Sequence, residues 1–329
     1  MNHKFPVEKD TRQVWLVWFT NRSGSTLLLN ELNKYTKIVA LPEGDRLADY
    51  LLSKPGNLAK NNQALIDNLN RLFETDPKLT LWRIRITLTD VAGSKTYADL
   101  FFKILVKAAA GLKPDFEIAV FKDTYIGNYF AQIEKSLSTP NKISLILLVR
   151  DPRSVFCSQK QTIGSWRKPM SSNPISTSTE WTKRIQVFTT IPGSKKMLRY
   201  EDFVANPDAV LANLFMDFNF PPTVKENRFS DSYFQRIPKH LQPIHRRILF
   251  PPNTSRIDCW ENELLPTEIF AVEFKCRYLL GELGYTANHY RPFEIFLSAN
   301  GFNFLIWMLK DWLTRVKKNC RKRQLPPLK

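Results

Sequence analysis

The stretch that decides the fold is residues 14–31, VWLVWFTNRSGSTLLLNE. Its first six residues are β-branched, aromatic or leucine, which is typical of a buried strand. A turn of small and polar residues follows at 20–26, and apolar residues then recur at helical spacing through Tyr35. A strand, a short turn and a helix in this order point unpaired backbone N–H groups at an anion.

The turn carries the side chains that an anion site needs. Gly24 lets the backbone approach a ligand, and Arg22 supplies a fixed cation. Ser23, Ser25 and Thr26 add hydroxyl donors. The pattern GxxxxGK[ST] is absent, because no Gly lies five residues before Gly24 and no Lys follows it. These residues predict a phosphate-like group held at a helix N-terminus.

A second stretch has the same chemistry. Residues 143–149, ISLILLV, form the most apolar strand candidate, and Arg150 follows it directly. Asp151 can cap the next helix, and Pro152 suits its first turn. Ser158 comes eight residues after Arg150, about two helical turns on. An Arg at the end of a strand and a Ser on the next helix can therefore close on one phosphate.

Both stretches resemble one family. Arg22-Ser-Gly-Ser-Thr26 resembles the 5′-phosphosulfate loop of sulfotransferases that use 3′-phosphoadenosine 5′-phosphosulfate (PAPS). Carbohydrate sulfotransferases read R-S-G-S-[ST] there, and the cytosolic aryl enzymes have Lys for Arg. Arg150-Asp-Pro-Arg153 with Ser158 is similar to the family's 3′-phosphate segment, R-[DN]-P-[RK] with a Ser eight residues after the first Arg. The resemblance covers roughly residues 12–285.

The resemblance also implies further donor contacts. The sequence RYEDF at 199–203 is similar to the family's [RY]-Y-E-D-[LF], which places Tyr200 near the nucleotide; a purely structural aromatic is the open alternative. Ser255 and Arg256 lie where the family has a loop over the 3′-phosphate, although the glycines of the aryl enzymes' loop are missing. No metal is expected, since the family needs none.

The catalytic residues follow from the chemistry of transfer. Cations and N–H donors must face the charge that grows on the donor, and a base must take the acceptor's proton. The resemblance implies Arg22 as stabiliser of the leaving 5′-phosphate and Lys122 as a contact to the sulfonate. Aryl sulfotransferases use a His as base, but Lys122-Asp123-Thr124 at the matching place has none. Glu43 is the predicted base, because carbohydrate sulfotransferases place a Glu similarly, and Asp123 is the reserve.

The order of elements predicts an α/β protein. Strand candidates at 37–41, 116–122, 143–149 and 196–200 alternate with helix candidates at 46–75, 98–112, 126–137, 207–218 and 266–283. Residues 79–89 are left open between a strand and a helix start. Alternating strands and helices favour a doubly wound parallel sheet. With the resemblance, the expected fold is three-layer α/β/α with a central parallel sheet, similar to P-loop NTPases.

Composition limits the class of partner and of compartment. The 329 residues carry 48 Lys and Arg against 31 Asp and Glu, a net charge of +17 that favours anionic partners. The four cysteines form no CxxC pair and no metal-like spacing with His, so we expect idle thiols in a reducing compartment. The polar first 13 residues look like neither a signal peptide nor an anchor. We therefore expect a cytoplasmic enzyme, of the bacterial or carbohydrate sulfotransferase type.

The C-terminal segment differs from the rest. Aromatic and aliphatic residues fill 293–316, and a basic run follows to Arg323. This pattern fits a helix on an anionic membrane face with Trp307 and Trp312 at the interface, or a helix packed on the body or on a second subunit. We expect a sulfotransferase domain at 1–290 and a helical extension at 291–329.

Together these observations predict a sulfotransferase that moves a sulfuryl group from PAPS to a hydroxyl of a carbohydrate or glycolipid. Two alternatives stay open: an ATP-dependent nucleotide or small-molecule kinase with a P-loop-like fold, and a non-enzymatic basic protein that binds membrane or nucleic acid. The leading hypothesis needs no nucleic acid. The resemblance implies that the acceptor pocket is built from variable loops, which here would be the residues near 40–60, 80–100, 159–180 and 225–250.

Overall fold

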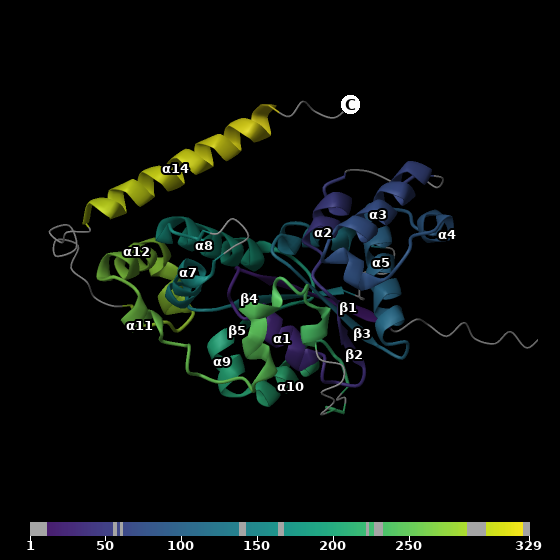
Figure 1. Cartoon of the computed structure of the whole chain (residues 1–329), viewed down its shortest axis with the longest axis horizontal. Helices are drawn as coiled ribbons and strands as arrows, with labels where there is room; N and C mark the ends of the chain where they lie inside the picture. Colours follow the sequence, from purple (N-terminus) through teal and green to yellow (C-terminus); the bar gives the residue numbers. More distant parts are fainter. Residues whose placement is uncertain are drawn as a thin grey trace, which may run out of the picture. The chain divides into compact units, whose positions relative to one another are not determined.

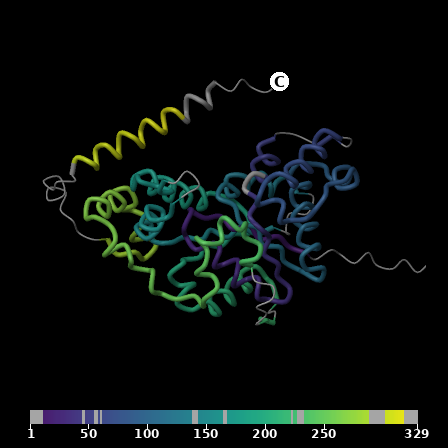
Figure 2. Tube along the Cα trace, in the orientation of Figure 1, coloured from purple at the N-terminus to yellow at the C-terminus, as the bar shows by residue number. Residues whose placement is uncertain are grey.

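The structure is a computed structural model, drawn in Figures 1 and 2. It describes residues 12–54, 58–59, 62–137, 143–163, 168–221, 224–226, 233–287 and 301–324. The chain divides into two compact units. The first comprises Met1–Phe19, Gly24–Leu148 and Thr190–Pro252, and the second comprises Thr20–Ser23, Val149–Thr189 and Asn253–Lys329.

A five-stranded sheet forms the centre of the first unit, in the order β2-β3-β1-β4-β5. Its strands are β1 (Gln13–Phe19), β2 (Ile38–Ala40), β3 (Ile118–Asp123), β4 (Ile143–Val149) and β5 (Lys195–Arg199). Strand β1 pairs in parallel with both β3 and β4, and β2 pairs in parallel with β3. The expected α/β fold with a central parallel sheet flanked by helices is therefore confirmed (Figure 1).

The central strands are buried along their length, which explains their unbroken apolar sequences. All seven residues of β4 and six of the seven in β1 are buried. A parallel sheet with helices on its faces has no solvent side, so its strands do not alternate between apolar and polar residues. Trp15 of β1 packs edge-on against Phe218 and Phe220, so the hydrophobic core includes the residues just after α10 (Pro207–Asp217).

Helices of the first unit follow the strands closely. They are α1 (Ser25–Leu32), α2 (Asp45–Leu52), α3 (Gln63–Thr75), α4 (Leu88–Ala92), α5 (Tyr97–Leu112), α6 (Phe130–Ser136), α9 (Tyr200–Ala205) and α10 (Pro207–Asp217), with short 3₁₀ helices η1 (Leu79–Trp82), η2 (Ile126–Asn128), η5 (Tyr233–Arg236) and η6 (Gln242–Leu249). The undecided stretch 79–89 forms no strand here. Its first turn is η1, and Arg83, which caps η1, has a left-handed φ of 52° that is incompatible with a strand. The helix α4 then begins after a capping box formed by Thr87 and Asp90.

The second unit is helical. It contains α7 (Pro152–Gln161), α8 (Pro174–Thr190), α11 (Trp260–Glu263), α12 (Pro266–Glu282) and α14 (Gly301–Gln324). Phe304 of α14 is buried with Ile175 of α8 and Ala271 of α12, and Trp307 packs against the same cluster. The expectation of a packed C-terminal helix is thus met on one face, and Trp307 belongs to that face rather than to an exposed one. Among the described residues, no helix is long and apolar enough to cross a membrane.

Candidate active site

The turn after β1 has the backbone of an anion-binding loop. Arg22 and Gly24 both have positive φ, 75° and 91°. Gly24 is the N-cap of α1 and has no side chain that could accept from the first N–H groups of that helix. The Ser23 hydroxyl is buried and has no hydrogen-bond partner among the described residues. A buried hydroxyl without a hydrogen bond destabilises the folded protein, and a bound ligand could supply that hydrogen bond.

Tyr200 lies directly against this loop. A Cβ added to Gly24 would come within 2.4 Å of Cδ2 and Cε2 of the Tyr200 ring. Glycine is therefore required here twice, by its left-handed backbone and by the close approach of the ring. Tyr200 was expected either near the nucleotide or as a purely structural aromatic. The structure places its ring against Gly24, in the loop that was expected to bind the donor.

The second unit brings the Arg22 turn and the residues after β4 into direct contact. The Arg22 guanidinium donates from Nε to the Ser158 hydroxyl of α7 over 3.2 Å. Arg150, which is buried, donates from Nη1 to the Arg22 carbonyl over 3.2 Å. Arg22 is 128 positions from Arg150 and 136 positions from Ser158 in the sequence. The two predicted anion-binding stretches therefore meet, as a single phosphorylated ligand would require.

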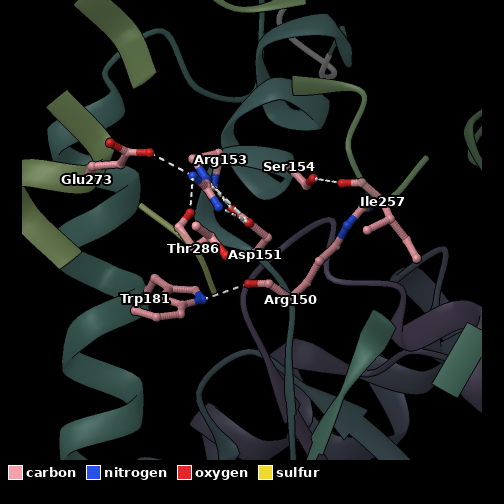
Figure 3. Close-up of polar contacts among 8 residues, drawn as sticks. All are labelled: Arg150, Asp151, Arg153, Ser154, Trp181, Ile257, Glu273 and Thr286. Atoms are coloured by element: carbon pink, nitrogen blue, oxygen red, sulfur yellow. Dashed lines mark hydrogen bonds and ion pairs between the residues drawn. The ribbon is translucent and has the colours of Figure 1, made fainter. Parts of the chain in front are cut away.

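The start of α7 is held in place by a buried polar network, shown in Figure 3. The Asp151 carboxylate accepts from the Arg153 N–H over 2.8 Å as the helix cap and also forms an ion pair with the Arg153 side chain at 2.7 Å. Arg153 in turn reaches Glu273 at 2.6 Å and the Thr286 carbonyl at 2.8 Å. Trp181 donates to the Arg150 carbonyl over 2.9 Å. The Arg150 carbonyl is thus held by Trp181, and the residues that follow it are held by the Arg153 network.

Glu43 and Lys122 form a buried ion pair at the end of β3. The Lys122 ammonium lies 2.6 Å from the Glu43 carboxylate and donates to the Thr26 hydroxyl over 2.6 Å. Lys78 pairs with the other oxygen of Glu43 at 2.7 Å. Burial raises the pKa of Glu43, but the two ammonium groups outweigh this and hold its pKa far below the ordinary value. Glu43 is therefore ionised at any working pH, as a proton acceptor must be.

Asp123, the reserve base, has another structural role. Its side chain is fully buried, and Oδ1 accepts from the Tyr125 N–H over 2.6 Å, which shapes the turn after β3. The neighbouring Trp18 donates to the Thr124 carbonyl over 2.9 Å in the same turn.

Ser255 and Arg256, which were expected to lie over the 3′-phosphate, are held by contacts within the protein. Arg256 is paired with Glu263, Nη2 to Oε2 at 2.9 Å, and its carbonyl accepts from Arg150 over 2.6 Å. Ser255 is exposed and hydrogen-bonds within its own turn, to Asn253. The backbone of this loop therefore meets Arg150, whereas the Arg256 side chain is held by a carboxylate.

Three site residues escape prediction from the sequence. Arg184 of α8 donates to the Thr20 hydroxyl over 3.3 Å, and Gln159 of α7 donates to the Asn21 carbonyl over 2.9 Å. Lys78 reaches Glu43 from the segment before η1. No motif marks them. The only available signal for Gln159 is its place next to Ser158 on the same helix.

Comparison with known proteins settles the family. The model of the sulfotransferase family matches residues 16–221, which is more than half of the chain and includes both anion-binding segments. The chain belongs to the sulfotransferase family. A search of curated proteins finds no match.

Solved sulfotransferase structures agree on the fold. The sulfotransferase domain from the curacin biosynthetic pathway aligns with a TM-score of 0.51 at 18% identity, over 84% of this chain and 99% of its own. The sulfotransferase domain from the Synechococcus PCC 7002 olefin synthase aligns with a TM-score of 0.53 at 17% identity, over 86% of this chain and 98% of its own. At these identities the likeness concerns the fold alone.

Membership decides between the three functional hypotheses. This sulfotransferase is an enzyme of the class that takes its sulfuryl group from PAPS, so the kinase and the non-enzymatic hypotheses are set aside. The residues present fit such a donor. The loop offers the uncapped N-terminus of α1 and the buried Ser23 hydroxyl, which has no hydrogen-bond partner in the part of the chain that the structure describes. Arg150 and Ser158 lie beside Arg22, where a second phosphate can be held.

Proposed function

We propose that this sulfotransferase transfers the sulfuryl group of PAPS to a hydroxyl of a carbohydrate or glycolipid, with Glu43 as the base. The observation that carries the donor part is the contact of Arg22 with both Ser158 and Arg150. Arg22, Ser23, Gly24, Ser25 and Thr26 would hold the 5′-phosphosulfate. Arg22 would also stabilise the charge on the leaving 5′-phosphate.

The 3′-phosphate is assigned to Arg150 and Ser158. Arg150 is buried at the end of a strand and fixed through its backbone, so its guanidinium is positioned before the ligand arrives. Ser255 and Arg256 are secondary candidates, because Arg256 must first leave Glu263. Tyr200, packed on Gly24, would lie beside the nucleotide.

Glu43 is a stronger candidate for the base than Asp123. Its carboxylate is bound to two lysines that a sulfonate can compete for, whereas Asp123 holds the backbone of a turn. When Lys122 turns to the sulfonate, Glu43 loses the cation that most lowers its pKa and becomes a better proton acceptor. Donor binding would thus prepare the base.

The base is tested by Glu43→Gln, with Asp123→Asn as its counterpart. Glu43→Gln should abolish transfer and leave the affinity for adenosine 3′,5′-bisphosphate nearly unchanged, as measured by calorimetry. Persisting turnover in Glu43→Gln, together with its loss in folded Asp123→Asn, would assign the base to Asp123 instead.

The donor site is tested by thermal stabilisation. Adenosine 3′,5′-bisphosphate at a hundred times its Kd should stabilise the protein by about 2.7 kcal/mol, while ATP, ADP and NAD at equal concentration should give less. Arg150→Ala should weaken bisphosphate binding by about 1–3 kcal/mol, the range for a charge-assisted hydrogen bond. Arg150→Lys keeps the charge but loses the guanidinium fork, so it should recover only part of this. Unchanged affinity in both variants would remove the 3′-phosphate assignment.

The acceptor is proposed to lie at an anionic membrane surface that α14 contacts. One face of α14 packs on its own unit, and another exposes apolar side chains at helical spacing: Phe302, Leu305, Leu309, Trp312, Leu313 and Val316. The sequence of α14 has seven Lys and Arg against one Asp. Two copies of so basic a helix repel each other, whereas anionic lipid attracts them, at about 1 kcal/mol per basic residue near the surface.

Flotation of the full chain with lipid vesicles tests this proposal. Binding should require phosphatidylserine and should fall in Leu309→Asp and Trp312→Asp, which place a charge on the exposed apolar face. Thr314→Asp adds the same charge on a different face and is the matched control. Binding that ignores the lipid charge, or a dimer in gel filtration that the same two variants dissociate, would contradict the membrane proposal.

A further inference from the structure

Two cysteines from distant parts of the sequence meet in the second unit. Cys157 lies in α7 and is buried, and Cys259 is the N-cap of α11 and only partly buried. Their sulfur atoms and a carboxylate oxygen of Glu263 all lie within 4.8 Å of one another. The Cys157 thiol donates to Glu263 Oε2 over 2.9 Å. The sequence alone gave no sign of this arrangement, because the two cysteines share no short motif.

The surroundings make the two thiols unequal. A hydrogen bond from Cys157 lowers the pKa of Cys259 most, burial and Glu263 oppose this, and the guanidinium groups of Arg256 and Arg150 lower it further, to about 7. The hydrogen bond to Cys259 raises the pKa of Cys157, and burial and Glu263 raise it further. Cys259 is therefore the sulfur that loses its proton more readily and Cys157 the one that keeps it, which is the division of roles in a reactive thiol pair.

A bound metal explains this cluster less well. The Glu263 carboxylate already accepts hydrogen bonds from Arg256 at 2.9 Å and from Gln161 at 2.6 Å. The positive charges of Arg256 and Arg150 oppose a cation but stabilise a thiolate. The same charges that favour Cys259 as a nucleophile thus disfavour it as a metal ligand.

We propose that Cys157 and Cys259 form a redox-active pair that hydrogen peroxide oxidises to a disulfide. The Cys259 thiolate attacks one peroxide oxygen, the O–O bond breaks, and with one proton the products are a Cys259 sulfenic acid and water. The Cys157 sulfur then attacks the sulfenic sulfur. The S–S bond forms, and the Cys157 proton leaves with the hydroxyl as a second water. The two thiols lose two electrons, and the peroxide gains them.

The pair lies where oxidation and donor binding would influence each other. Arg150 donates to the carbonyl of Arg256, three residues before Cys259, and Arg150 is the residue assigned above to the 3′-phosphate. A phosphate at Arg150 would compete with the thiolate for positive charge, so each should disfavour the other. This coupling rests on the proposed function, whereas disulfide formation does not.

The test uses the reduced full chain, treated with hydrogen peroxide and analysed by differential alkylation and peptide mass spectrometry. A Cys157–Cys259 disulfide within one chain is expected. Cys276 is the internal reference, because burial raises its pKa to about 12. At pH 7 a far larger fraction of Cys259 than of Cys276 is thiolate, although the Cys259 thiolate, as the weaker base, is the weaker nucleophile. The two effects together predict that Cys259 reacts with iodoacetamide at least about a hundredfold faster than Cys276.

Variants separate the two roles. Cys259→Ser should stop the oxidation, Cys157→Ser should leave a sulfenic acid at Cys259 that dimedone traps, and Cys276→Ser should change neither result. A disulfide to Cys320 or between chains, or a wild-type Cys259 that alkylates no faster than Cys276, would overturn the proposal without touching sulfotransfer. Adenosine 3′,5′-bisphosphate should slow the alkylation of Cys259 several-fold. Bound bisphosphate with no protection would refute the coupling and leave the thiol pair in place.

Discussion

The ion pair between Glu43 and Lys122 offers a quantitative test of the proposed base. Lys122→Met replaces the ammonium, which is 2% exposed, by an apolar chain of similar length and leaves Glu43 buried beside Lys78 alone. Breaking a buried pair by removing one partner costs about 3–5 kcal/mol. Because Lys78 remains 2.7 Å from the carboxylate, we expect about 3 kcal/mol, the lower end of that range.

A double-mutant cycle isolates the pair. Glu43→Gln combined with Lys122→Met should cost less than the sum of the single changes, with a coupling of about 2 kcal/mol in urea unfolding at pH 7. Lys78→Met is the matched control, since this lysine is more exposed, and its coupling to Glu43 should be about 1 kcal/mol or less.

The coupling between Glu43 and Lys122 should weaken only as the pH falls. The folded-state pKa of Glu43 is lowered, so the pair stabilises the protein fully above the ordinary pKa of a carboxyl group and loses its effect as pH falls through the lowered value. The coupling should therefore be equal at pH 7 and pH 5 and decline only in stronger acid. A coupling below about 0.5 kcal/mol at pH 7 would show that the two groups do not interact as a buried pair, and the proposed control of the base would fail.

Three further predictions concern the loop and the base. Ser23→Ala removes a buried hydroxyl that has no hydrogen-bond partner among the residues described, so the ligand-free protein should be equally or slightly more stable in thermal unfolding. Bisphosphate affinity in calorimetry should fall by about 1 kcal/mol; a clear loss of stability would contradict this. Gly24→Ala should destabilise the protein by about 1–3 kcal/mol in urea, and Tyr200→Ala in the same chain should relieve only the steric part, since the positive φ remains. At saturating donor, the rate of transfer should fall in acid as Glu43 takes up a proton, and the apparent pKa of that fall should lie above the lowered pKa of Glu43 in the ligand-free protein. Lys78→Met should raise this apparent pKa further. An apparent pKa that Lys78→Met leaves unchanged would argue against Glu43.

The strands of the fold could be predicted because burial on two faces leaves a simple trace in the sequence. The apolar run at 143–149 predicts β4 to the residue, and 14–19 predicts β1 to within one. The stretch 79–89 could not be decided, because its alternation of apolar and polar residues suits a strand. A left-handed Arg83 and the burial of Leu79 and Trp82 at a spacing of three select the 3₁₀ turn instead, and both depend on tertiary packing.

The candidate site divides in the same way. The contact of Arg22 with Arg150 and Ser158 was predictable, because all three lie just after the ends of neighbouring parallel strands, where spacing along the chain is constrained. Lys78 was not. It reaches Glu43 from a distant segment, and nothing local distinguishes it from the other lysines of a basic chain.

The resting state of Glu43 explains why its assignment needs the structure as well as the motif. A carboxylate with so low a pKa is a weak proton acceptor, which by itself argues against a catalytic base. The cause of the low pKa reverses the argument, because Lys122 lowers it most and Lys78 lowers it further. Among the residues that the structure describes, the Lys122 ammonium contacts the Glu43 carboxylate, the Thr26 hydroxyl and the face of the Phe19 ring. A sulfonate offers that ammonium a better partner. The group that most lowers the pKa of Glu43 is therefore the group that the donor would draw away, so the base would gain strength once there is a sulfuryl group to transfer.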